Sequence, residues 1–73
     1  MLVYASDKII TGTSSTQDLL QVTVYDLSGR LLFMEKQINS RTFSIPLKHV
    51  ADQMVLVQVA TERGVVTKKV MLY

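Results

Sequence analysis

Very few side chains in this sequence have the chemistry that catalysis needs. His49 is the only imidazole and there is no cysteine, so nucleophilic catalysis would require a serine or threonine placed beside His49. His49 lies between Lys48 and Val50, and no motif directs a hydroxyl group toward it. A lone histidine in such a setting is interpreted as a surface or boundary residue.

The six carboxyl side chains are dispersed along the chain. Asp26 and Glu62 fall in segments typical of turns, where an aspartate side chain bonds to its own backbone. The other four are Asp7, Asp18, Glu35 and Asp52, at expected strand ends or exposed positions. No two of the six have a spacing that predicts an acid–base pair across a cleft. We therefore expect no enzymatic activity.

Cofactor sites are not indicated by the sequence either. The three glycines are isolated from one another and do not form a phosphate-binding loop. A structural zinc site needs several histidine or cysteine ligands, and the chain offers one histidine. The expectation is a domain with no metal and no cofactor.

The charge pattern does not favour a nucleic-acid partner. The formal net charge is +2, from eight basic and six acidic residues. The basic residues are scattered singly, apart from the adjacent Lys68 and Lys69, whereas nucleic-acid binding needs a basic stripe with exposed aromatic rings. A sugar-binding face stays open as an alternative through Tyr25, although there is no tryptophan and Phe43 falls in a buried register.

The elements that position these residues are β-strands, because apolar residues alternate with a period of two along most of the chain. In the third strand, for example, Leu20, Val22 and Val24 are predicted to face the core. The expected strands are 2–5, 8–11, 20–25, 30–37, 41–45, 54–61 and 65–72.

Turn residues separate these strands. The tetrapeptide from Asp26 to Gly29 has aspartate at the first and glycine at the fourth position of a type I turn. Gly29 is expected to take a positive φ and to join two antiparallel strands. Gly64 is assigned the same role before the last strand.

The segment after Pro46 departs from the period of two. Leu47, Val50 and Ala51 are spaced i, i+3 and i+4, which predicts one helical turn packed on the core. We interpret this turn as the crossover between two sheets. The whole pattern predicts an all-β fold, a seven-stranded antiparallel immunoglobulin-like β-sandwich forming a single domain over residues 1–73.

Three segments together resemble a known family. Residues 21–32, QVTVYDLSGRLL, resemble the V-x-V-Y-D-x-x-G-R/K-x-V/L hairpin of the C-terminal sorting domains of the type IX secretion system in the Bacteroidota (Por secretion system type A-like). Residues 54–59 resemble the penultimate strand of that family, and residues 64–72 resemble its last turn and terminal strand. The resemblance spans residues 8–73.

The resemblance implies a non-catalytic targeting domain at the C-terminus of a larger exported protein. Such a domain follows an N-terminal cargo domain and directs it, via the periplasm and the outer-membrane secretion machinery, to the cell surface or the medium. By this resemblance, the recognition residues are Gly64, Lys68, Lys69, Val70, Leu72 and Tyr73. Lys68 and Lys69 are the favoured pair, because two adjacent charges on a terminal strand have no packing role.

Two other kinds of partner stay open. The domain is alternatively an accessory immunoglobulin-like module that packs on a neighbouring domain or binds a protein or a glycan. The free edges of a small sandwich also permit a homodimer formed by edge-strand pairing. The position of the domain in its parent protein distinguishes the sorting role from the accessory role.

Overall fold

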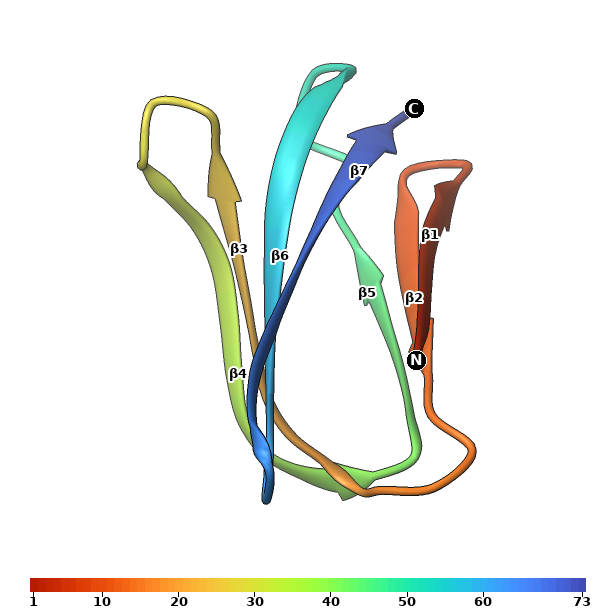
Figure 1. The fold of residues 1–73 in the computed structure, drawn as a ribbon. Coiled ribbons are helices and arrows are strands. Elements are labelled where there is room, and N and C mark those ends of the chain that lie inside the picture. The colour runs from red at the N-terminus through yellow and green to blue at the C-terminus, as the bar shows by residue number, and fades with distance from the viewer.

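The computed structural model describes residues 1–73, which form seven strands and no helix (Figure 1). The strands are β1 (Leu2–Ser6), β2 (Ile9–Thr13), β3 (Leu19–Asp26), β4 (Leu31–Ser40), β5 (Thr42–Pro46), β6 (Gln53–Thr61) and β7 (Gly64–Leu72). The predicted all-β fold and the predicted number of strands are confirmed. Strand ends lie within three residues of their predicted positions.

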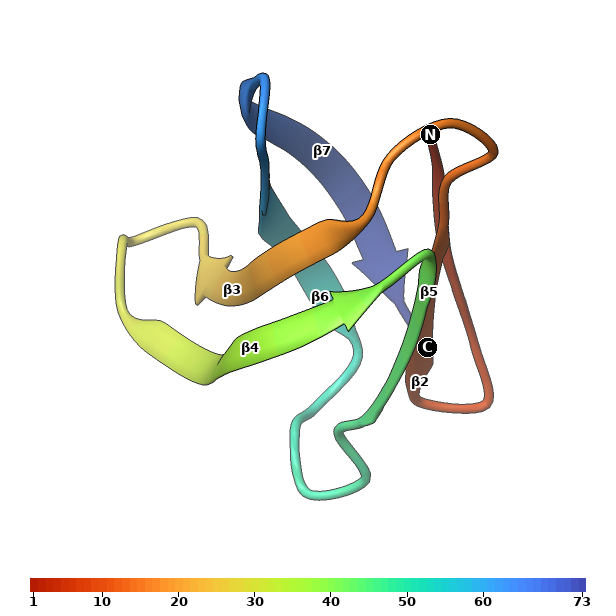
Figure 2. The same cartoon turned by 90° about the horizontal axis from the view of Figure 1, so that it is seen from below.

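The strands form two antiparallel sheets that face each other (Figures 1 and 2). One has the order β1-β2-β5 and the other the order β4-β3-β6-β7. These orders correspond to strands A-B-E and C′-C-F-G of an immunoglobulin-like sandwich. The predicted fold class is therefore correct.

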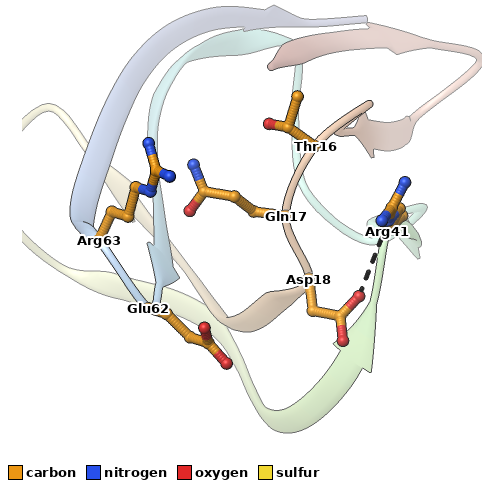
Figure 3. A pocket seen from close by; sticks show the side chains of 6 residues that line it. All are labelled: Thr16, Gln17, Asp18, Arg41, Glu62 and Arg63. Atoms are coloured by element: carbon orange, nitrogen blue, oxygen red, sulfur yellow. Dashed lines mark ion pairs between the residues drawn. The ribbon is translucent and has the colours of Figure 1, made fainter.

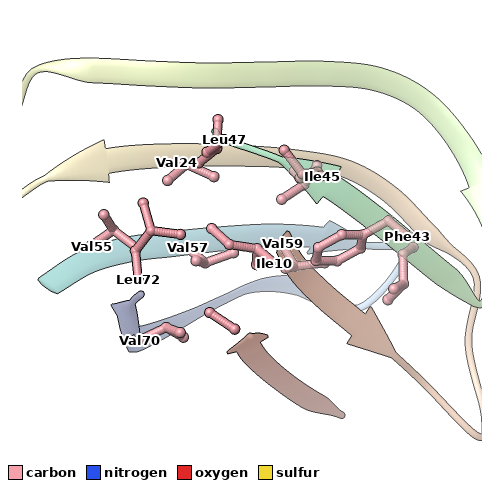
Figure 4. Close-up of a cluster of buried hydrophobic side chains, with 13 residues drawn as sticks. Ile10, Val24, Phe43, Ile45, Leu47, Val55, Val57, Val59, Val70 and Leu72 are labelled. Atoms are coloured by element: carbon pink, nitrogen blue, oxygen red, sulfur yellow. The ribbon is translucent and has the colours of Figure 1, made fainter. Parts of the chain in front are cut away.

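A single apolar core fills the space between the sheets (Figure 4). Val55, Val57 and Val59 of β6 are completely buried, and Val22 and Val24 of β3 lie beside them. The remaining core residues are Ala5, Ile10, Leu19, Phe43, Ile45, Leu47, Val70 and Leu72. Six of the seven strands and the segment after β5 thus supply buried residues to the core, as the period of two predicts.

The predicted buried face of the third strand is wrong at its first residue. Leu19 is completely buried, whereas Leu20 is only half-buried. The pairing of β3 with both of its neighbours shifts between Leu19 and Gln21. This bulge adds one residue and reverses the alternation, so the predicted register holds from Val22 onward.

The predicted helical turn after Pro46 is a single hydrogen-bonded turn. The Val50 amide donates to the Leu47 carbonyl at 3.1 Å, and Leu47 and Val50 both pack on the core. Ala51 is exposed, contrary to the prediction. One such bond does not propagate into a helix, and the segment serves as the predicted crossover from one sheet to the other.

The β3–β4 turn forms where the sequence predicts it. Gly29 has a φ of 93°, and its amide donates to the Asp26 carbonyl at 3.1 Å. The Asp26 carboxylate also accepts hydrogen bonds from the Ser28 hydroxyl at 2.7 Å and from the Arg30 amide at 2.9 Å. The Asp26 carboxylate therefore stabilises the turn through these hydrogen bonds. Gly29 adopts a backbone conformation that residues with a side chain rarely adopt.

Replacing Gly29 by valine is expected to destabilise the domain by about 1–3 kcal/mol, because a β-branched residue resists a positive φ. The measurement is the urea midpoint of unfolding. Leu27→Val is the matched control, since Leu27 lies in the same turn without a positive φ. Equal midpoints for Gly29→Val and the parent would contradict this account of the turn.

The four-stranded sheet has two edge strands, β4 and β7, and each carries one charge in its core-facing register. Glu35 lies opposite Val22, and Lys68 lies opposite Val57. Both valines are completely buried, whereas both charged residues are exposed. An inward-pointing charge on an edge strand opposes pairing with another strand. These charges therefore disfavour the homodimer that the free edges permit.

Lys68→Val is expected to cause self-association, because it completes an apolar stripe along an exposed edge strand. Thr67→Val is the matched control, since it adds the same side chain to the other face of β7. Sedimentation velocity over a range of concentrations measures the outcome. The proposed role of the Lys68 charge in opposing edge pairing is wrong if Lys68→Val stays monomeric, or if Thr67→Val associates to the same degree.

Candidate functional site

Some of the recognition residues that the family resemblance implies are buried in β7, and others are accessible. Val70 and Leu72 are buried in the core. Gly64 has a φ of 129° and begins β7 immediately after the tight β6–β7 turn. These three residues therefore have structural roles that explain their identity without any partner.

Lys68, Lys69 and Tyr73 are the accessible members of the set. Successive strand residues point to opposite faces, so the two lysines are adjacent in sequence but lie on different sides of the sheet. Lys68 lies in the core-facing register at the free edge, and Lys69 lies on the outer face opposite Leu56. A flat partner surface can therefore contact one of the two lysines, but not both.

Lys8 fixes the end of the terminal strand. Its amide donates to the main-chain oxygen of Tyr73 at 2.6 Å, and its carbonyl accepts from the Leu47 amide at 2.8 Å. Its ammonium group forms an ion pair with Asp52 at 2.6 Å and a hydrogen bond to the Val50 carbonyl. One lysine thus joins the β1–β2 turn, the crossover and the end of β7.

The sequence prediction missed this role, because it placed Lys8 at the start of a strand. Asp7 and Lys8 form a two-residue hairpin turn with φ values of 53° and 64°. Turns with two positive φ values usually contain glycine or asparagine. The Asp-Lys dipeptide therefore gave no turn signal.

A polar pocket of about 280 Å³ lies at the opposite end of the sandwich (Figure 3). It is formed by the β2–β3 loop, the β4–β5 junction and the β6–β7 turn. Its lining contains no hydrophobic residue and consists of Thr16, Gln17, Asp18, Arg41, Glu62 and Arg63. No sequence motif predicted it, since its three segments are far apart in the chain.

Hydrogen bonds from Ser14 and Arg41 hold the pocket's loop in place. The Ser14 hydroxyl accepts from the amides of Thr16 at 3.4 Å and Gln17 at 3.2 Å. The Ser14 amide donates to the Arg41 carbonyl at 2.8 Å, and the Arg41 guanidinium donates back to the Ser15 carbonyl at 3.0 Å. These hydrogen bonds thus connect the β2–β3 loop to the β4–β5 junction.

The pocket contains polar groups that lack partners. The Gln17 Oε1 atom is buried and accepts no hydrogen bond. Arg63 and Glu62 form no ion pair, and the Arg41–Asp18 pair is long, at 4.0 Å. A buried acceptor without a donor is unusual in a folded protein. The Arg63 guanidinium and the Glu62 carboxylate in the lining are free to contact a small polar ligand.

The histidine and the carboxylates do not form a metal-binding cluster. His49 lies in the crossover, at the other end of the sandwich from the pocket. No three histidine, cysteine or carboxylate side chains gather where they could hold a metal ion. The chain also forms no helix of the length and hydropathy needed to cross a membrane.

Comparison with known proteins assigns the chain to a family. A family model described as a domain of unknown function, DUF8694, matches residues 1–72. The chain belongs to this family. No curated protein matches it. The family description carries no activity, so the proposals below rest on geometry and on the sequence resemblance.

The β3–β4 turn lowers the pKa of Asp26 below its ordinary value of 3.8. The main cause is the hydrogen bond from the Ser28 hydroxyl, followed by that from the Arg30 amide, while burial acts in the opposite direction. A carboxyl whose folded-state pKa is depressed stabilises the fold when ionised. That contribution is present above pH 3.8 and is lost as the pH falls through the folded-state pKa.

Asp26→Asn is expected to lower the urea midpoint at pH 6, because the neutral amide accepts weaker hydrogen bonds than the carboxylate. The difference from the parent should narrow as the pH falls below 3.8. Glu62→Gln is the control, since its carboxylate forms no ion pair. A constant difference between Asp26→Asn and the parent from pH 6 to pH 2 would contradict the assigned role.

Proposed function

We propose that the domain is a non-catalytic C-terminal sorting domain, which directs a cargo protein through the outer membrane to the cell surface or the medium. One observation carries the proposal: the strand that resembles the family's terminal strand is an exposed edge strand. Val70 and Leu72 anchor this strand in the core, while Lys68, Lys69 and Tyr73 stay accessible. A folded signal needs both properties.

The position of the two termini supports this proposal. The first and last strands run in the same direction, so the chain enters at one end of the sandwich and leaves at the other (Figure 1). A cargo domain that precedes residue 1 would therefore attach at the end that contains the pocket. The end of β7 would remain free to contact the outer-membrane secretion machinery.

The structure shows how this proposal has to be tested. Removal of residues 68–73 would delete Val70 and Leu72 from the core and would also break the hydrogen bond between Lys8 and Tyr73. Large apolar deletions of this kind destabilise a domain by several kcal/mol. A truncated domain would therefore fail through unfolding, and surface substitutions are needed instead.

The test is a fusion of residues 1–73 behind a periplasm-directed fluorescent reporter, in a bacterium with a working type IX system. The parent fusion is expected to reach the surface or the medium. The double variant Lys68→Glu/Lys69→Glu is expected to stay in the periplasm, because recognition of the terminal strand depends on those charges.

The control is Lys36→Glu/Lys48→Glu, which changes the net charge equally at exposed residues on other elements. This control should be exported like the parent. Circular dichroism of each purified variant verifies that it is folded. Retention of the folded parent fusion in the periplasm would refute the sorting role and favour an accessory role.

The second candidate function is an accessory module that binds a neighbouring domain, a protein or a glycan. The pocket favours it, because Glu62 is free to accept hydrogen bonds and Arg63 is free to donate them. Sugar hydroxyl groups both donate and accept. No aromatic side chain lines the pocket, so a glycan there would be held by hydrogen bonds without ring stacking.

A further inference from the structure

The outer face of the four-stranded sheet, which points away from the core, carries several exposed or partly exposed apolar side chains. Tyr25 lies opposite both Leu31 and Leu56, and Met54 lies opposite Met71. Among these, Leu31 is 48%, Met54 36% and Met71 45% exposed. The methionine patch is defined as Tyr25, Leu31, Met34, Met54, Leu56 and Met71.

Polar residues bound this patch on one side. The next row of the sheet contains Met34 followed by Thr23, Gln58 and Thr67. Thr23 is only 5% exposed although it points away from the core, because Met34 and Gln58 flank it. The six side chains of the patch therefore lie toward the end of β7, and this polar row separates them from Val65 at the start of the strand. They form one surface rather than scattered exposed residues.

The composition of the patch is typical of a protein interface. Aromatic residues and methionine are enriched at such interfaces, and three of the four methionines of the chain lie in this patch. Methionine is flexible and polarizable, so methionine-rich surfaces adapt to a partner. A contiguous apolar surface on a small domain marks an interaction site.

The charges around the patch indicate what kind of partner it takes. Lys69 borders the patch opposite Leu56, and Lys36 lies farther along the same face opposite Gln21. Both are exposed. None of the six carboxyl groups lies on this outer face, since Asp26 and Glu35 share the core-facing register and the others are in loops or turns. The face is thus apolar and exclusively cationic.

We propose that the methionine patch is a docking surface for a partner protein whose own contact segment is apolar and carries carboxylates. An acidic group on the partner would pair with Lys69 at the border of the patch, while apolar side chains cover Met54 and Met71. This inference does not depend on the sorting role. A neighbouring domain with such an apolar, carboxylate-bearing segment would bind in the same way.

Charge also argues against two other occupants. A second copy of this chain would bring its own Lys69 and Lys36 and no carboxylate to the contact, and like charges across an interface are unfavourable. An anionic membrane surface is attracted by clusters of four to eight basic residues, whereas this face has two. A protein with complementary carboxylates is the occupant that the face fits best.

The test is a titration of the isotopically labelled protein, followed by amide chemical shifts. The probe is an amphipathic peptide with a leucine face and glutamate elsewhere, and the control probe has lysine in place of every glutamate. The glutamate peptide is expected to shift amides of β3, β4, β6 and β7 around the patch. The lysine peptide should leave them unchanged.

Two pairs of variants sharpen this test. Met71→Thr and Lys69→Glu are each expected to weaken binding of the glutamate peptide about tenfold, because the first removes an apolar contact and the second reverses the charge that pairs with glutamate. Val65→Thr is the control for Met71→Thr, because Val65 is 65% exposed on the same face of the same strand but outside the patch. Lys48→Glu is the control for Lys69→Glu, because Lys48 is exposed in the crossover and not on this face. Neither control should change the affinity.

Several results would overturn the proposal. Equal shifts with both peptides, or shifts confined to the loops of the polar pocket, would show that the patch does not select an acidic partner. Cosedimentation with phosphatidylglycerol vesicles without any response to the peptide would assign the face to a membrane. Concentration-dependent dimerisation that Met71→Thr abolishes would assign it to a second copy.

Discussion

The packing of two sheets around one layer of buried side chains is the interaction on which this domain depends. A chain of 73 residues without cysteine has no disulfide to compensate for a small core. The valines of β3 and β6 are completely buried at its centre. Four other strands add buried side chains around them, and β4 adds partly buried ones. Phe43 enters this layer because Gly12 lies opposite it, where a Cβ would lie 2.2 Å from the ring.

This constraint divides the terminal strand into two sets of residues. Val70 and Leu72 belong to the core, so their apolar character is required for folding. A sorting signal in β7 is therefore restricted to the side chains that folding does not use, chiefly Lys68, Lys69 and Tyr73. The hydrogen bond from Lys8 fixes the end of the strand and presents those side chains on a rigid edge.

The sequence predicted the features that depend on local pattern and missed those that depend on distant segments. Alternating valines indicated the strands, and the Asp26–Gly29 turn follows directly from residue chemistry. The Leu20 bulge leaves no local signal, and the pocket joins three loops. The methionine patch was hidden because Met54, Leu56 and Met71 add apolar residues to the outer face of strands whose inner face is also apolar, which weakens the alternation that distinguishes the two faces.

Lys68 and Lys69 show why adjacency in sequence is a poor guide to shared function in a sheet. The pair looks like a single basic signal, but strand geometry sends the two side chains to opposite faces. Lys68 projects at the open edge of the core, where its charge opposes pairing with another strand. Lys69 borders an apolar surface, where its charge selects a partner. A partner that needs both lysines must wrap around the edge of β7, and one that needs only Lys69 can lie flat on the sheet.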